Sequence, residues 1–357
     1  MKTADVVIAA NTIWVVVAAV LVMFMQAGFA LLEAGLARMK NAAHIAGKNV
    51  LVFGVCSLVY WAVGFGLAFG DGNAIAGTHG FFPSSGALLA IGQAPFSFFT
   101  SVPGAAGYLF EVVFAGVSLA IVWGAMAERA KLWVYFAFGA VFTVLYSITS
   151  HWVWHPSGWL YSLGMQDFAG STVVHYQGAL AALVAITAAC GFVAPWAAIV
   201  IGLASGFLAV TGVLVVERLG IDDPIGAVAV HGASGVWGTI ATGLFAVPAL
   251  AANLGTGSGG FVYTGSLHQV WVQLVGLAAV GAFTFSVSFG ALWTMKQLWG
   301  IRVEPHIETS GLDVSEHGMW GYPEFYIPVP GGYGTEAHGH LLGHRHPHPT
   351  AAEPEAA

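Results

Sequence analysis

Long apolar runs separated by short polar segments make up most of this chain. With histidine counted as neutral, no charged side chain occurs at positions 6–32, 49–70, 132–166 or 168–216. A helix needs about 20 predominantly apolar residues to cross a bilayer, so each run is long enough for at least one crossing. The pattern predicts an all-α polytopic membrane protein with eight spans, at residues 6–33, 45–70, 106–127, 132–154, 171–191, 196–216, 225–247 and 268–297.

The composition excludes several classes of function. Hydrophobic residues make up 57% of the chain and charged residues 8%, whereas soluble domains contain about 25% charged residues. The net charge of −7 argues against a nucleic-acid partner. Cys56 and Cys190 lie in apolar runs and have no metal-ligand spacing. Because the sequence has no nucleophile motif and no cofactor-binding loop, we predict no enzyme, no cofactor and no metal site.

One nine-residue pattern occurs twice, each time leading into an apolar run. Asp167 and His175 belong to the first copy and Asp223 and His231 to the second, and the histidine of each pair follows its aspartate by eight positions. On a helix that rises about 1.5 Å per residue, each imidazole lies about 12 Å below its aspartate. That depth is near the middle of a hydrocarbon core about 30 Å thick. Ionisable residues at this depth indicate a functional site, and two copies indicate an internal repeat of the kind found in transporters.

The positive charges conflict with eight crossings. The positive-inside rule assigns four basic groups to the cytoplasm, namely Arg38 with Lys40 and Lys48, Arg129 with Lys131, Arg218, and Lys296 with Arg302. The first four spans obey the rule if the N-terminus is outside. The segment 171–191 then enters from outside, and 196–216 would return Arg218 to the outside. Either an odd number of crossings is missing between His175 and Arg218, or one of these two segments does not span the membrane.

Five motifs follow one another in a fixed order. They are MQAGFALLEAG at 25–35, DFAGSTVVH at 167–175, DDP at 222–224, VHGASGVWG at 230–238 and GLDVSEHG at 311–318. Together they resemble the ammonium transporter (Amt/Rh) family, over residues 11 to 323. The resemblance implies the ammonium-transporter fold, an inverted repeat of helices that assembles as a homotrimer in the cell (inner or plasma) membrane. It also implies ammonium or ammonia as the substrate, an N-terminus outside and a C-terminus in the cytoplasm.

The same resemblance implies six site residues along the path of the substrate. They are Phe110, Trp154 and Asp167 at an outer vestibule that recruits ammonium, Phe114 at a gate, and His175 and His231 in the pore. Aromatic faces attract a cation by about 0.5–2 kcal/mol. Neutral NH₃ crosses an apolar lumen at far lower cost than the cation does, and each imidazole can offer one hydrogen-bond donor and one acceptor.

Structural roles compete with functional ones at several acidic positions. Asp167 can cap a helix by accepting backbone N–H bonds, and Asp222 and Asp223 are predicted to be caps of the same kind. We expect Glu33 to have a structural hydrogen-bonding role and Glu111 to lie at the external end of its span.

The chain departs from the family in its middle. The family has eleven helices, whereas eight spans are recognisable here. Residues 173–184 resemble the fifth family helix and pass directly into 185–193, which resembles the end of the eighth. This join predicts an internal deletion near 184–186 that removes a second gate phenylalanine and a vestibular serine. It puts in question whether His175 and His231 face one another and whether the chain transports.

Three regions and three functions follow from these patterns. Residues 1–300 form a membrane transport domain, 301–327 a cytoplasmic regulatory tail, and 328–357 a His/Pro-rich tail that we expect to be disordered. The resemblance implies a PII-type regulator as a partner of the regulatory tail. Ammonium transport is the leading function. The alternatives are a non-transporting family remnant that binds ammonium or serves as a regulatory subunit, and a bis-histidine haem protein.

Overall fold

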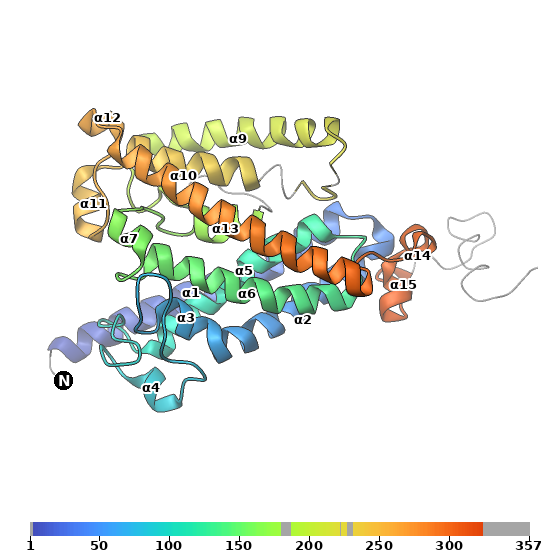
Figure 1. Ribbon diagram of the computed structural model, residues 1–357, viewed down its shortest axis with the longest axis horizontal. Coiled ribbons are helices and arrows are strands. Elements are labelled where there is room, and N and C mark those ends of the chain that lie inside the picture. The colour runs from blue at the N-terminus through green and yellow to red at the C-terminus, as the bar shows by residue number, and fades with distance from the viewer. Residues whose placement is uncertain (1–2, 180–186, 222, 227–230, 324–357) are drawn as a thin grey trace, which may run out of the picture.

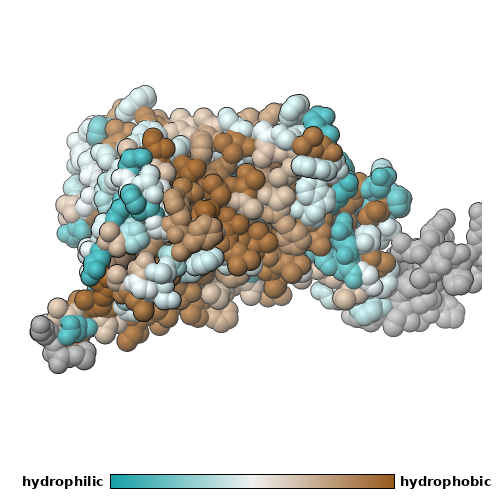
Figure 2. All heavy atoms as spheres, turned by 60° about the horizontal axis from the view of Figure 1, so that its bottom comes forward, coloured by the Kyte–Doolittle hydropathy of each residue, from teal (hydrophilic) through white to brown (hydrophobic). Residues whose placement is uncertain are grey.

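The computed structural model describes residues 3–179, 187–221, 223–226 and 231–323, and the regular elements in these residues are helices. Among them, six helical segments are long and apolar enough to cross a membrane. They are α1 (Thr3–Leu36), Met39–Phe69, α5 (Gly104–Met126), Leu132–Leu163, α9 (Pro195–Arg218) and α13 (His268–Trp299). Apolar side chains form a broad belt between two more polar ends (Figure 2). The prediction of a polytopic membrane protein is confirmed.

The other elements are shorter. Met39–Phe69 consists of η1 (Met39–Asn41), α2 (Ala42–Val59), the π-helix η2 (Tyr60–Gly64) and α3 (Phe65–Phe69), and Leu132–Leu163 contains α6 (Leu132–Trp154) and α7 (Trp159–Leu163). The rest are α4 (Ser85–Leu89), the π-helix η3 (Ser171–Tyr176), α8 (Gln177–Ala179), α10 (Ala233–Phe245), α11 (Pro248–Leu254), α12 (Phe261–Thr264), α14 (Pro305–Ser310) and α15 (Leu312–His317).

The long helices run between two ends of the molecule, which we call the loop end and the tail end (Figure 1). The loop end carries the start of α1, the connection 70–103 with α4, and the helices α7, α11 and α12. The tail end carries α14 and α15. Backbone hydrogen bonds tie the loop-end segments together, for example from Trp159 N to Ala74 O at 3.1 Å and from Val247 N to Phe192 O at 2.7 Å.

The predicted span at 171–191 is wrong, because the chain enters and leaves this region at the same end. Helix η3 starts at the loop end and α8 continues it to Ala179. By Thr187 the chain is again beside its starting point, since Ala169 N donates to Thr187 O at 2.9 Å and Phe168 N donates to Ala188 O at 3.2 Å. The segment is therefore re-entrant.

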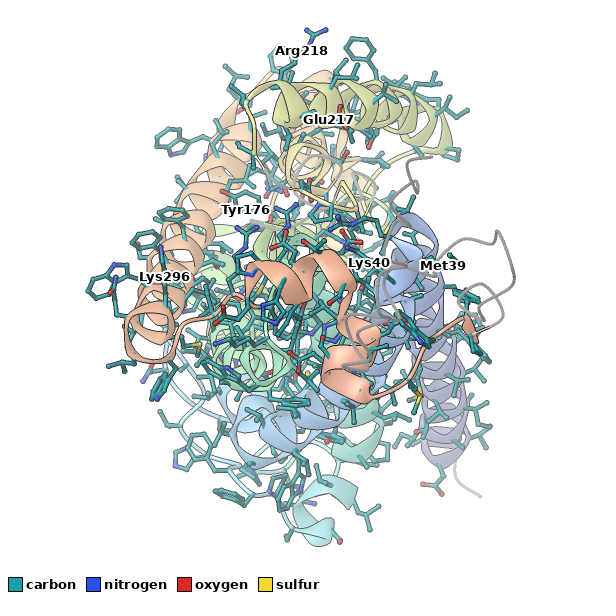
Figure 3. The ribbon with its side chains drawn as sticks, turned by 90° about the vertical axis from the view of Figure 1, so that its right-hand side faces the viewer. Met39, Lys40, Tyr176, Glu217, Arg218 and Lys296 are labelled. Atoms are coloured by element: carbon teal, nitrogen blue, oxygen red, sulfur yellow. The ribbon has the colours of Figure 1, made fainter. Side chains whose placement is uncertain are left out.

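This re-entrant segment removes the conflict among the positive charges. Helix α9 starts at the loop end and reaches the tail end at Arg218, on the same side as Lys40 and Lys296 (Figure 3). Arg129 lies at that end too, because its carbonyl accepts a hydrogen bond from Val303 N at 2.9 Å. Of the two explanations that the charges allow, the structure favours a segment that does not span.

The predicted span at 225–247 is only partly helical among the described residues. Residues 223–226 form a turn, and the helix is described from His231 through α10 to Phe245. Helix α10 ends at the loop end, where Val193 and Ala246 form an isolated bridge. Helix α13 then returns to the tail end.

A fully buried ion pair joins α1 to α2. The Lys48 ammonium lies 2.7 Å from a carboxylate oxygen of Glu33, and neither side chain is exposed. The Asn49 amide donates to the same oxygen at 3.0 Å. Most other side chains of α1 point away from the core. The structural role predicted for Glu33 is confirmed, because this pair fixes the tail-end half of α1 against α2.

The start of the regulatory tail packs against α2. The Asp313 carboxylate accepts hydrogen bonds from Ala43 N at 3.1 Å and His44 N at 2.8 Å. Nearby, burial disfavours the charged form of Glu128, but hydrogen bonds from Arg38 and Asn41 outweigh that effect and lower the pKa of Glu128. The residues from 324 on lie outside the described part, so the predicted tail at 328–357 stays a prediction.

Candidate functional site

Asp167 holds the start of the helix that carries His175. One carboxylate oxygen accepts from Gly170 N at 3.0 Å, and the other accepts from Thr172 N and Val173 N, each at 2.9 Å. These are the N–H groups that the first turn of a helix leaves without an internal partner. Gly170 has a φ of +95°, and a Cβ there would lie 2.3 Å from the Val174 side chain. The sequence DFAG therefore forms a cap for η3.

The π-helical turn η3 places His175 inside the protein. π-Helical turns are rare and often occur at functional sites. The His175 side chain is buried, and its Nδ1 has no hydrogen-bond partner among the described residues. The Ser118 hydroxyl of α5 donates to Val174 O at 2.9 Å, which fixes this turn against α5.

The structure brings the two predicted pore histidines together. The imidazole centroids of His175 and His231 are 6.2 Å apart, and the two planes are inclined by only 20°. On the other side of His231, the ring of Phe29 stacks at 6.1 Å. The predicted deletion put the facing of the histidines in question, and the structure shows that they do face one another.

The two Asp-x₇-His copies approach this pair from opposite ends. Asp167 lies at the loop end, where its carbonyl accepts from Trp154 Nε1 at 2.6 Å. Asp223 lies at the tail end and lines a cavity there together with Arg129 and Glu217. The duplicated sequence pattern is thus an inverted pair in space, as in transporters built from inverted repeats.

The predicted caps of the second copy, Asp222 and Asp223, both stay predictions. Asp222 lies outside the described residues, so its role stays a prediction. Asp223 is in a turn that Gly226 N closes by donating to Asp223 O at 3.0 Å. The residues that follow this turn, 227–230, lie outside the described part, so the predicted cap at Asp223 stays a prediction as well.

Three predicted residues of the substrate path line one cavity near Asp167, which we call the aromatic cavity. It has a volume of about 280 Å³ and is lined by Phe69, Phe98, Phe110, Glu111, Phe114, Trp154, Phe168 and Ala169. The Phe110 and Phe114 rings pack edge to face at 5.0 Å. The cavity can hold a small cation against aromatic faces.

Two residues of this region were not predicted as part of the site. Phe29 belongs to the MQAGFALLEAG motif but was given no role, and it stacks on His231. Glu111 was expected only at the external end of its span, and it lines the aromatic cavity. Its position next to Phe110 and three residues before Phe114 was the available signal, because these three positions lie on the same side of a helix.

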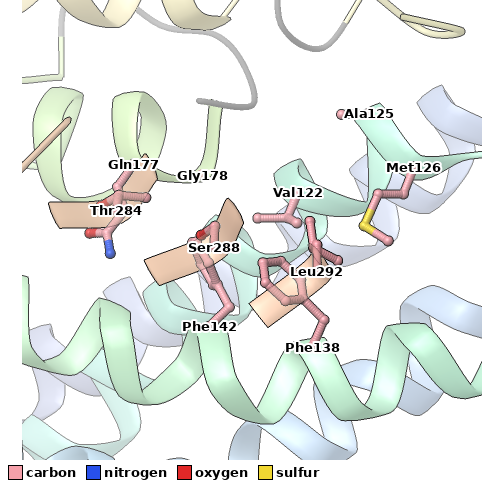
Figure 4. Close-up of a pocket in the computed structure, with 10 residues that line it drawn as sticks. All are labelled: Val122, Ala125, Met126, Phe138, Phe142, Gln177, Gly178, Thr284, Ser288 and Leu292. Atoms are coloured by element: carbon pink, nitrogen blue, oxygen red, sulfur yellow. The ribbon is translucent and has the colours of Figure 1, made fainter. Parts of the chain in front are cut away.

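A second, smaller cavity lies on the tail-end side of His175 (Figure 4). It has a volume of about 120 Å³ and is lined by Gln177 and Gly178 of α8 and by side chains of α5, α6 and α13. Phe138, Phe142 and Leu292 make much of its wall apolar. Gln177 also accepts a short hydrogen bond from the Thr149 hydroxyl, so the end of the re-entrant helix is anchored to α6.

Comparison with known proteins identifies this architecture. The profile of the Ammonium Transporter Family matches residues 13–184 and again residues 176–322, so the two matches overlap where the deletion was predicted. Ammonium transporter Amt2 of Archaeoglobus fulgidus is 32% identical over 434 aligned positions that cover 88% of each chain. Because 434 positions exceed the 357 residues here, that alignment includes a segment of Amt2 without a counterpart.

Other relatives and solved structures agree. The ammonium transporter of Bacillus subtilis is 27% identical, with 88% of this chain and 98% of that protein covered. A structure described as a sensor Amt protein superposes with a TM-score of 0.77 at 26% identity, covering 88% of this chain and 99% of that one. Saccharomyces cerevisiae Mep2 gives a TM-score of 0.75 at 25% identity, covering 84% and 88%. With the family profile matched along almost all of the membrane region, the chain belongs to the ammonium transporter family.

Proposed function

We propose that this chain transports ammonium by binding NH₄⁺ in the aromatic cavity, removing a proton and passing NH₃ along His175 and His231. The main support for this proposal is the stacked histidine pair, whose ring centroids lie 6.2 Å apart in a chain that is shorter than its relatives. The relatives are named as ammonium transporters, which supports the same substrate.

The aromatic cavity suits the cation and the histidine pair suits the neutral molecule. Phe110 and Trp154 present ring faces that favour a cation. An unpaired charge is expensive in an apolar interior, so NH₄⁺ that has lost its proton passes inward at much lower cost. The imidazoles of His175 and His231 can then exchange hydrogen bonds with NH₃, because each neutral ring has one donor and one acceptor. K⁺ cannot lose a proton, which makes the path selective by chemistry.

The distribution of basic residues orients the protein in the proposal. With the tail end in the cytoplasm, the groups around Lys40, Arg129, Arg218 and Lys296 all obey the positive-inside rule. The loop end and the N-terminus are then outside, and the aromatic cavity faces the source of ammonium. Assembly as a homotrimer and binding of a PII-type regulator at the tail belong to the same proposal.

Uptake of methylammonium by cells that lack their own ammonium transporters tests the proposal. We expect uptake above the empty-vector level, and we expect added ammonium to suppress it. Membrane abundance is measured by immunoblot in the same cells. Absence of uptake at normal abundance would favour the non-transporting family remnant. A Soret band in the purified protein would favour the bis-histidine haem protein.

Trp154 is expected to contribute to the recruitment of the cation. Trp154→Leu removes the ring face and is expected to raise the KM of methylammonium uptake about 2- to 30-fold, the equivalent of about 0.5–2 kcal/mol. Trp154→Phe keeps a ring face and should have a smaller effect. Trp293→Leu, at an exposed tryptophan of α13, serves as the control. An unchanged KM in Trp154→Leu would remove the tryptophan from the substrate path.

A further inference from the structure

One acidic side chain lines the aromatic cavity without a basic neighbour. Glu111 is on α5, and none of the residues that line the cavity is a lysine or an arginine. Its Oε2 atom is buried and has no hydrogen-bond partner among the described residues. A carboxylate in such surroundings is costly unless a counter-charge and hydrogen-bond donors compensate it. The described residues supply neither to this oxygen.

Two tyrosine hydroxyl groups in this region are also buried without a hydrogen-bond partner among the described residues. Tyr60 of η2 and Tyr146 of α6 are fully buried, and neither hydroxyl has a hydrogen-bond partner among the described residues. Both interact electrostatically with Glu111. The Tyr146 ring also packs against Trp154, with 6.5 Å between the centroids. Buried polar groups nearly always have partners, so the unpartnered oxygen of Glu111, a residue that lines the cavity, indicates a polar ligand there.

We propose that Glu111 is the counter-charge that binds ammonium in the aromatic cavity. This inference rests on the proposed function and names the group that makes the cavity selective. Ammonium has four N–H donors and one positive charge, so it can make a charge-assisted hydrogen bond to the carboxylate. The aromatic faces attract the same charge. Because K⁺ requires a shell of several oxygens, a cavity walled mainly by carbon favours ammonium.

The binding step can be measured without transport. The purified full-length protein is unfolded by heat in ammonium chloride and in sodium chloride at equal ionic strength. A ligand that binds only the folded state raises the Tm. We therefore expect ammonium to raise the Tm of the wild type but not that of Glu111→Gln. That substitution keeps the size of the side chain and removes only its charge. Glu217→Gln, at an exposed tail-end position, is the matched control and should keep the wild-type response.

A second measurement uses the wild-type protein alone, so it decides the question even if Glu111→Gln does not fold. Tetramethylammonium and K⁺ both have the positive charge but no N–H donor. We expect both to raise the Tm less than ammonium does. An equal rise with tetramethylammonium or K⁺, or an equal rise in Glu111→Gln, overturns the assignment of Glu111.

The outcomes separate this inference from the proposed transport function. An ammonium-specific rise in Tm that depends on Glu111, in a protein without uptake, would contradict transport and support the binding site. Uptake that is suppressed by ammonium, with the same KM in Glu111→Gln as in the wild type, would support transport and overturn the role of Glu111. For the wild type we expect both the ammonium-specific rise in Tm and uptake of methylammonium. For Glu111→Gln we expect the KM of uptake to rise at least tenfold.

Discussion

Replacement of Lys48 by methionine is expected to destabilise the protein by about 3–5 kcal/mol. The Glu33 carboxylate would remain fully buried, and among the described residues only the Asn49 amide would still donate to its Oε2 atom, at 3.0 Å. Loss of one partner of a buried ion pair leaves an uncompensated charge, which costs more than the pair itself contributes. The ammonium also lies 5.4 Å from the centroid of the Tyr135 ring, and that contact would be lost as well. Thermal unfolding of the detergent-purified protein measures the effect.

A double replacement separates charge from packing in this prediction. Lys48→Met combined with Glu33→Leu removes both charges, and apolar replacements of a buried pair are often neutral or stabilising. We therefore expect the double variant to recover most of the stability that Lys48→Met loses. Lys296→Met, at an exposed position of α13, is the single-substitution control. Equal loss in the single and double variants would show that packing by the Lys48 stem, and not its charge, holds α1 against α2.

The fold was predictable wherever polar residues mark the ends of an apolar run. The runs at 6–33 and 268–297 have charged or polar flanks, and both appear as single helices, α1 and α13. The region 168–216 has no charged residue, so hydropathy cannot show where the chain turns back inside it. A re-entrant helix and a spanning helix have the same apolar composition. The error at 171–191 has this physical cause, and the position of Arg218 was the one observation that exposed it.

Most residues of the site could be predicted from the sequence, but the complete set could not. The family resemblance named Phe110, Phe114 and Trp154, which line one cavity, and His175 and His231, which stack. It did not give Glu111 a place in that cavity, because a glutamate beside an apolar span usually lies at the interface. Whether neighbouring side chains find a hydrogen-bond partner depends on the packing of three helices, and a sequence pattern does not contain that information.

The inverted arrangement explains how a shortened chain can keep its histidine pair. Asp167 fixes η3 from the loop end, and the second copy approaches from the tail end through His231 and α10. Asp167 holds the start of the helix that carries His175, and Phe29 of α1 stacks on His231, so neither contact depends on the residues between the two halves. The overlap of the two family matches at residues 176–184 supports a join in this region. Because Thr187 again lies beside Ala169 at the loop end, α9 starts there and runs toward the tail end.

Replacement of His175 by alanine is expected to lower ammonium-competed methylammonium uptake about 10- to 100-fold. The imidazole is buried and lies face to face with His231, so its removal deprives NH₃ of a hydrogen-bond partner at the centre of the path. An unmade hydrogen bond in a buried site costs about 1–3 kcal/mol, and each 1.4 kcal/mol changes a rate about tenfold. The Asp167 carboxylate accepts from backbone N–H groups, among them those of Gly170, Thr172 and Val173, and none of these bonds uses the His175 side chain, so η3 should keep its structure in the variant.

His268→Ala provides the matched control, because His268 is exposed at the start of α13 and lies in none of the contacts that form the site. It should take up methylammonium at the wild-type rate. Equal membrane abundance and equal Tm in the two variants would assign the loss in His175→Ala to the path and not to folding. Wild-type uptake by His175→Ala would mean that the substrate takes a route that avoids the histidine pair. The aromatic cavity would then be a recruitment site for a different pore.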